Sequence, residues 1–226
     1  MSKAVVLLSG GLDSTVTAAK AKADGHEIVC LTVQYGQRHE RELESARAVA
    51  QELDALEHIV LDVDLSAFGG SALTDEGIEV PLDRDEGEMS QDIPVTYVPA
   101  RNTVFLSLAL SLAEAREADH LYIGANAVDY SGYPDCRPVF LDAFEQVANL
   151  GTKRGVEHMS FRIHAPLLQL TKAEIVEMGQ EVQAPLSLTW SCYEGGKQQC
   201  GRCDACQLRK KGFAEAGVED PVGYAV

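Results

Sequence analysis

The chain has 226 residues, of which 46% are hydrophobic and 24% are charged. This composition excludes wholesale disorder, and the length suits one large α/β domain with a small appendage. The formal net charge is −16, from 19 Lys and Arg against 35 Asp and Glu. Such acidity argues against direct binding of nucleic acid or of an anionic membrane, because phosphate groups attract basic surfaces.

The apolar segments give no sign of export or of membrane insertion. The run at residues 4–8 is shorter than the core of a signal peptide, and the run at residues 104–113 is too short to span a bilayer. We therefore expect a cytoplasmic protein. Its six cysteines should stay reduced and serve as metal ligands or as core residues.

Short apolar runs alternate with helical patterns along most of the chain. Helices are predicted at residues 15–24, 38–53, 103–117 and 139–150, and a Thr171–Glu174 capping box opens another that ends near residue 180. Strands are predicted at residues 4–8, 28–33, 58–63, 121–124 and 161–165. This alternation predicts an α/β fold, an open parallel sheet with helices on both faces.

Two segments depart from that pattern. Residues 75–92 carry eight carboxylates against Arg84 alone, which predicts a solvated, mobile loop. They lie within a connection at residues 64–94 that is too long for a simple link, so this connection is expected to be either functional or disordered. From Pro185 the chain becomes cysteine-rich and loses its strand pattern. We therefore divide the chain into an α/β domain, residues 1–184, and a small C-terminal zinc-binding segment, residues 185–226, packed on it.

A glycine-rich turn, Ser9-Gly10-Gly11-Leu12-Asp13-Ser14, joins the first predicted strand to the first predicted helix. Glycines allow a tight turn and close approach to a ligand, and a helix N-terminus offers unpaired N–H groups to an anion. Such a turn binds phosphate without any lysine, which explains how an acidic protein could bind ATP. The candidate nucleotide-binding residues are Leu8, Ser9, Gly10, Gly11, Leu12, Asp13, Ser14 and Thr15. The string resembles the pyrophosphate loop of the N-type ATP pyrophosphatases, which cleave ATP to AMP and pyrophosphate.

Four cysteines follow the pattern C-x₇-C-x₂-C-x₂-C: Cys192, Cys200, Cys203 and Cys206. Four thiolates at this spacing suit one closed tetrahedral Zn²⁺ site, with a structural role. An iron–sulfur cluster and a redox dithiol pair are the competing interpretations. Cys30 lies in an apolar strand pattern and is predicted to be a core residue.

Three further polar strings follow a predicted strand or precede a helix, where binding sites are common. They are Tyr35-Gly36-Gln37-Arg38-His39, Val98-Pro99-Ala100-Arg101-Asn102 and the string from Asp129 to Arg137. With Thr189-Trp190-Ser191-Cys192-Tyr193 and the four cysteines, they resemble the 7-cyano-7-deazaguanine synthase family. The resemblance extends from about residue 4 to Leu208.

The resemblance implies a Rossmann-like fold of the adenine nucleotide alpha hydrolase type. It further implies an enzyme that converts 7-carboxy-7-deazaguanine, ammonia and ATP to the nitrile, 7-cyano-7-deazaguanine, a precursor of queuosine and archaeosine. Zn²⁺ bound by the four cysteines, Mg²⁺ used with ATP, and a homodimer are implied as well. The chain has no room for a glutaminase domain, so free ammonium or a separate partner is the expected ammonia donor.

Roles for single residues follow from that chemistry. Asp13, Ser14, Arg38 and Arg101 are the catalytic candidates, the arginines because they would neutralise phosphate or carboxylate charge. Asp129 and Asp135 would accept N–H bonds from the guanine-like edge, with Tyr130 or Tyr133 stacked on its ring. The full set of substrate-binding candidates is Gln37, Asn102, Asp129, Tyr130, Tyr133, Asp135 and Arg137.

Two other functions remain open at this stage. One is a tRNA-modifying pyrophosphatase, for which Cys136 supplies a cysteine outside the metal cluster, although the net charge disfavours an RNA partner. The other is a nucleotide-binding zinc protein without turnover.

Overall fold

The computed structural model describes residues 2–37, 40–75, 77–84, 93–126, 133–158 and 161–225. Its centre is a five-stranded, fully parallel sheet in the order β3-β2-β1-β4-β5. The strands are β1 (Lys3–Leu7), β2 (Glu27–Gln34), β3 (Glu57–Asp62), β4 (His120–Tyr122) and β5 (Arg162–His164). From β1 the chain adds β2 and β3 on one side, and then β4 and β5 on the other side. The strand order therefore reverses between β1 and β4.

Seven α-helices are described, and three short 3₁₀ helices lie in the connections. The α-helices are α1 (Leu12–Ala23), α2 (Arg41–Glu52), α4 (Arg101–Ala115), α5 (Pro138–Gly151), α6 (Lys153–His158), α7 (Lys172–Glu181) and α8 (Asp204–Glu215). The 3₁₀ helices are η1 (Ser66–Phe68), η2 (Pro134–Cys136) and η3 (Leu186–Leu188). No helix in the described ranges has both the length and the apolar character that crossing a membrane requires.

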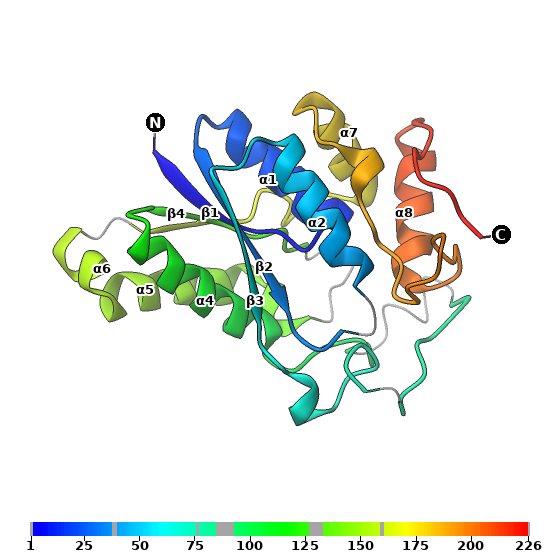
Figure 1. The fold of residues 1–226 in the computed structure, drawn as a ribbon, viewed down its shortest axis with the longest axis horizontal. Coiled ribbons are helices and arrows are strands. Elements are labelled where there is room, and N and C mark those ends of the chain that lie inside the picture. The colour runs from blue at the N-terminus through cyan, green and yellow to red at the C-terminus, as the bar shows by residue number, and fades with distance from the viewer. Residues whose placement is uncertain are drawn as a thin grey trace.

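Both faces of the sheet are covered, because side chains alternate along each strand. Val5 and Leu7 of β1 join a core with α4 and α5, whereas Ala4 and Val6 join one with α1 and α2. Figure 1 shows α4 and α5 on one side of the sheet and α1, α2 and α7 on the other. The predicted α/β fold with helices on both faces is therefore confirmed.

The elements differ from prediction in three places. Helix α1 begins at Leu12, directly after its N-cap Gly11, rather than at residue 15. Helices α6 and α8 were not predicted. The inward face of α8 carries Asp204 and Arg209 beside Phe213, so no apolar period of 3.6 marks this helix in the sequence.

The part of the acidic stretch around residues 82–84 is attached to the C-terminal segment that carries the four cysteines, residues 185–226, called the cysteine segment below. Leu82 forms an antiparallel bridge with Cys203, and the Asp83 N–H donates to the Arg202 carbonyl at 3.0 Å. The Asp83 carboxylate pairs with the Arg202 guanidinium, and Arg84 pairs with the buried Asp204. Leu82 and Asp83 are exposed, as the predicted solvated loop requires, but these bonds to the cysteine segment anchor residues 82–84. Residues 76 and 85–92 lie outside the described residues.

Helix α8 carries the C-terminal segment onto α7, as Figure 1 shows. Phe213 packs in one apolar cluster with Leu12 and Val16 of α1. The guanidinium of Arg209, 1% exposed, donates to both carboxylate oxygens of Asp220 at 2.9 Å and to the Thr189 hydroxyl at 2.6 Å. The division at residue 184 stays a prediction, but the segment beyond it shares its core contacts with α1 and α7.

The turn after β1 lies directly against α2. Gly10 has φ +87°, and a Cβ there would lie 2.3 Å from the Glu42 carbonyl oxygen and 2.6 Å from the Ala46 amide nitrogen. Only glycine meets both the backbone conformation and this contact without strain. The close contact fixes the start of α1 relative to α2.

We predict that Gly10→Ala destabilises the protein more than Gly25→Ala. Gly25 has nearly the same φ, +89°, but a Cβ there has no heavy atom within 4 Å. Gly25→Ala should therefore cost only the left-handed backbone penalty, about 1–2 kcal/mol. Gly10→Ala should cost about 1–3 kcal/mol more, because it adds overpacking. Urea unfolding measures both, and equal losses would contradict the close contact.

Candidate functional site

A cavity of about 270 Å³ opens beyond the carboxyl ends of the central strands. Its walls include the turn after β1, the segment after β4 and the start of α4. Open α/β sheets bind ligands in this position, where the strand order reverses between β1 and β4. The cavity is the candidate active site.

Most of the predicted phosphate loop lines this cavity: Leu8, Ser9, Gly11, Leu12, Asp13 and Ser14. The two serines hold the loop together. The Ser14 hydroxyl accepts from the Ser9 N–H at 3.1 Å and donates to the Gly11 carbonyl at 3.1 Å, while the Ser9 hydroxyl accepts from the Gly11 N–H at 3.2 Å. Gly10 does not line the cavity because it faces α2, and Thr15 is fully buried inside the protein.

The first turn of α1 leaves its backbone donors available. No described residue accepts a hydrogen bond from the N–H groups of Leu12, Asp13 or Ser14, and the helical ladder begins with Thr15 donating to Gly11. Opposite them, Gly124 brings the segment after β4 close, since a Cβ there would lie 3.0 Å from the Ser14 amide nitrogen. Free N–H groups at the positive end of a helix are suited to binding phosphate oxygens.

Lys172 also lines the cavity and was not identified from the sequence. Its ammonium contacts both carboxylate oxygens of Asp13, at 2.9 and 3.0 Å, although the two residues are 159 positions apart. Its side chain is largely buried. The capping box at Thr171 predicted where α7 starts, but nothing in the sequence indicated that its first residue reaches the phosphate loop.

Arg101 stands at the start of α4, behind Ala100, which adopts a left-handed conformation with φ +52°. Its guanidinium lies over the Tyr35 ring, 5.7 Å from the centroid, and donates weakly to the Tyr35 hydroxyl at 3.5 Å. Burial raises the pKa of Tyr35 to about 12, so this phenol is neutral at physiological pH. Arg101 therefore brings a cation into the cavity on an aromatic support.

The substrate candidates separate into two groups. Gln37, Asn102 and Tyr133 line the cavity. Asp135 and Arg137 do not: the Asp135 carboxylate accepts from the Asn102 N–H at 3.0 Å at the start of α4, and Arg137 is exposed and donates to the Pro134 carbonyl. Arg38, Asp129 and Tyr130 lie outside the described residues.

Glu42 is a second cavity residue that the sequence did not reveal. It is the second residue of α2, partly buried, and its side chain lines the cavity wall. The pKa of Glu42 is raised to about 7, because the effect of burial outweighs the lowering by the charge on Arg101. The helical pattern of residues 38–53 predicted α2 but could not say which of its many charged residues faces inward.

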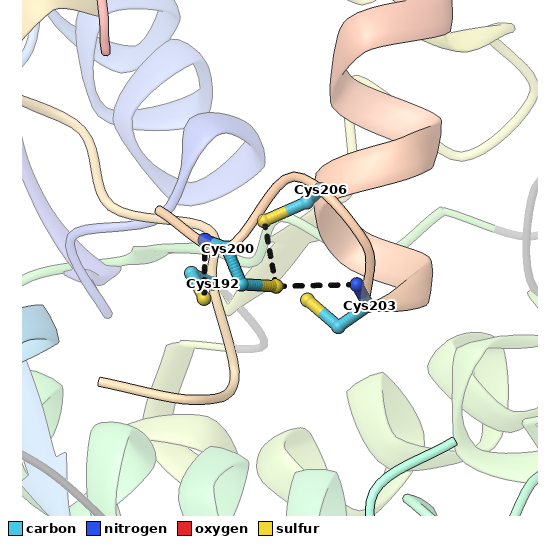
Figure 2. A group of neighbouring side chains, drawn as sticks. All are labelled: Cys192, Cys200, Cys203 and Cys206. Carbon is cyan, nitrogen blue, oxygen red and sulfur yellow. Dashed lines mark hydrogen bonds between the residues drawn. The ribbon is translucent and has the colours of Figure 1, made fainter. Parts of the chain in front are cut away.

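The four cysteines form a compact cluster, shown in Figure 2. Their sulfur atoms all lie within 4.8 Å of one another. The Cys192 sulfur accepts from the Cys200 N–H at 3.2 Å, and the Cys200 sulfur accepts from the Cys203 N–H at 3.2 Å. Hydrogen bonds from the Cys203 and Cys206 thiols hold the pKa of Cys192 well below its usual range. The donor set fits a metal ion with four sulfur ligands.

Cys30 and the cysteine segment differ clearly in their surroundings. Cys30 is fully buried in β2, and this burial raises its thiol pKa to about 12, so the prediction of a core residue is confirmed. The cysteine segment, by contrast, contributes Trp190, Ser191 and Tyr193 to the cavity wall. The Trp190 N–H also donates to the Gly10 carbonyl at 2.9 Å. The cluster is therefore positioned to hold one wall of the cavity against the phosphate loop.

Comparison with solved structures gives the fold alone. A structure described as a predicted subunit of tRNA methyltransferase from Methanocaldococcus jannaschii aligns with a TM-score of 0.51 at 18% identity. The alignment covers 80% of this chain and 75% of that one.

Comparison with protein sequences gives the family. The model described as "Queuosine biosynthesis protein QueC" matches residues 3–217. A 7-cyano-7-deazaguanine synthase from Anaeromyxobacter dehalogenans is 60% identical, over 99% of this chain and 96% of its own. One from a Nostoc species is 55% identical, over 99% and 97%. Because these matches extend over nearly the whole chain at such identity, the chain belongs to the QueC family of queuosine biosynthesis proteins.

Proposed function

We propose that this chain is an ATP-dependent carbon–nitrogen ligase that converts 7-carboxy-7-deazaguanine and ammonia to 7-cyano-7-deazaguanine. Relatives named 7-cyano-7-deazaguanine synthase align over nearly the full chain. The observation that carries the proposal is that the phosphate loop, Arg101 and several aromatic side chains open into one cavity. Phosphate donors, a cation and a ring-binding surface are what activation of a heteroaromatic carboxylate requires.

The reaction needs two activations of one carbon atom. The carboxylate attacks the α-phosphate of ATP, which gives an acyl adenylate and pyrophosphate. Ammonia then displaces AMP and loses a proton, which leaves the amide. The amide oxygen attacks the α-phosphate of a second ATP, which releases a second pyrophosphate, and the nitrogen loses a proton. Departure of AMP with the last nitrogen-bound proton leaves the nitrile. Positioning and charge stabilisation suffice for these steps without a covalent enzyme intermediate.

In this scheme the N–H groups of Leu12, Asp13 and Ser14 bind the departing pyrophosphate. The Lys172 ammonium neutralises phosphate charge, and its ion pair with Asp13 holds this ammonium in place before ATP binds. Mg²⁺ bound with ATP would also offset phosphate charge, and Asp13, a carboxylate within the loop, is the candidate residue to hold it. Arg101, and by the resemblance Arg38, stabilise negative charge on the carboxyl group or on the leaving AMP.

The remaining candidates position the substrate. Gln37, Asn102 and Tyr133 would contact it from the cavity wall, with Tyr133 stacked on the ring. Asp135 would act indirectly. Its carboxylate orients the start of α4, and thereby Arg101 and Asn102. By the resemblance, the substrate would also be contacted by Asp129, Tyr130 and Arg137.

The product assay tests the reaction. Protein is incubated with Mg-ATP, ammonium and the carboxy-deazapurine, and the products are identified by mass spectrometry. We expect the nitrile together with AMP and pyrophosphate, and the amide at early times. Parallel incubations with ATP alone and with tRNA serve as controls. Pyrophosphate release that requires tRNA, or ATP binding without any turnover, would contradict the proposal.

We further propose that the four-cysteine site holds one Zn²⁺ with a structural role. The four closely spaced cysteines, three of them fully buried, support a closed site, and its position near Trp190 links it to the cavity wall. The metal would fix residues 190–206 without taking part in the chemistry.

The zinc proposal predicts the metal content of two variants. The natural chain and Cys30→Ala should each carry about one zinc per chain, because Cys30 lies in the core away from the cluster. Cys206→Ser should lose most of the metal and melt at a lower temperature. Elemental analysis and thermal melting measure both. Iron with visible absorbance, or full zinc retention by Cys206→Ser, would overturn the assignment.

The remaining proposals concern partners. We propose a homodimer in the cytoplasm that acts on small molecules, with no direct nucleic-acid or membrane partner. Exposed apolar side chains on α5 and α6, Val139, Val147, Leu150 and Val156, offer a surface that self-association would cover. Ammonia would come as free ammonium or from a separate partner.

A further inference from the structure

Two carboxylates line the cavity within the described residues, and only one of them is engaged. Asp13 is bound by Lys172. Glu42 has no ion-pair partner and no hydrogen-bond donor in the described part of the chain; it lines the cavity, and its carboxylate is close enough to Arg101 to interact with that charge. A carboxylate oxygen in such a wall is expected to have a partner, because leaving it unsatisfied costs free energy.

The position of Glu42 at the start of α2 does not by itself explain it. Acidic side chains are favoured there by the helix dipole, and Glu44 in the same turn shows the ordinary arrangement. Glu44 is exposed and pairs with Arg41 at 2.9 Å. The backbone carbonyl of Glu42 instead packs against the turn at Gly10, and Glu42 lines the cavity.

Arg101 carries the opposite charge in the same cavity. The two groups interact electrostatically, yet no ion pair joins them, and Arg101 has no carboxylate partner among residues with a described position. The side chains of Tyr35 and Phe105, which contact one another with ring centroids 5.5 Å apart, form part of the wall beside them. The cavity thus offers an anionic acceptor, a cationic donor and aromatic surface, and neither charge forms an ion pair within the described ranges.

A deazaguanine ring with a carboxyl group has a complementary set of groups. Its ring N1–H and its 2-amino group are adjacent donors on one edge, and a carboxylate can accept from both. Its carboxyl group is an anion on the other side of the ring system. We propose that Glu42 accepts these two N–H donors and thereby selects a 2-amino-bearing ring. This inference rests on the proposed function and adds the residue that would read the base.

The test compares Glu42→Gln with Glu44→Gln on two substrates. One is the carboxy-deazaguanine, and the other is the same molecule without its 2-amino group. The side-chain amide introduced by Glu42→Gln would place an N–H against the substrate donors, so KM for the full substrate should rise about 10–100-fold. Since this is binding shared by ground and transition states, kcat should change less than about threefold.

The substrate without the 2-amino group provides the decisive arm. Its KM should differ by less than about threefold between the natural chain and Glu42→Gln, because the one remaining donor, the ring N1–H, can be accepted by the Gln amide oxygen as well as by the carboxylate. Glu44→Gln should match the natural chain with both substrates. Turnover of the amino-free substrate by Glu42→Gln also shows that this variant is folded.

Two results would overturn the inference while leaving the proposed function intact. They are an equal rise in KM for both substrates, and no rise for either. If the natural chain makes no nitrile from the carboxy-deazaguanine, the proposed function fails and this inference fails with it. The two failures are distinguishable because the second appears without any variant.

Discussion

The structure depends on the close packing of the turn between β1 and α1. Gly10 contacts the backbone of α2 and accepts a hydrogen bond from the Trp190 N–H, while Gly124, in the segment after β4, approaches the first turn of α1. These contacts come from three distant parts of the chain. Together they hold the N–H groups of Leu12, Asp13 and Ser14 at the carboxyl edge of the sheet, where a phosphate can reach them.

This arrangement reconciles the strong acidity of the chain with its proposed use of ATP. The proposed donors to ATP are backbone groups, supplemented by Lys172 and Arg101 on the cavity wall. Two basic residues of the cysteine segment already have acidic partners: Arg202 pairs with Asp83, and Arg209, which also lines the cavity, pairs with Asp220. The net charge therefore describes the outer surface, and the local charge of the cavity is set by a few placed side chains.

The cysteine cluster acts on the cavity through the chain that connects them. Cys192 follows Trp190 and Ser191 directly, and both line the cavity. Arg209 fixes the same stretch from behind, since its guanidinium donates to Thr189 and to Ser191. Loss of the proposed metal ion would therefore release a wall of the site, although no sulfur atom of the cluster lines the cavity.

The sequence predicted the features that depend on local pattern. The apolar strands, the glycine turn and the cysteine spacing each carry their own signal, and the parallel sheet follows from their order. It could not predict Lys172 or Glu42, because their roles depend on where α7 and α2 place one side chain relative to a loop distant in sequence. Helix α8 was missed because it buries Arg209 and Asp204, whose partners compensate for the charge. Asp135 looked like a ligand-binding carboxylate, yet its carboxylate accepts a backbone N–H of α4.

The central claim is that backbone N–H groups at the start of α1 bind the pyrophosphate part of ATP. Titration of the ¹⁵N-labelled protein with Mg-pyrophosphate, followed by NMR, tests it most directly. We expect the amide resonances of Leu12, Asp13 and Ser14 to show the largest shifts, and the resonance of the Lys172 ammonium to shift as well. Shifts concentrated away from the β1–α1 turn, with these three amides unchanged at saturation, would contradict it.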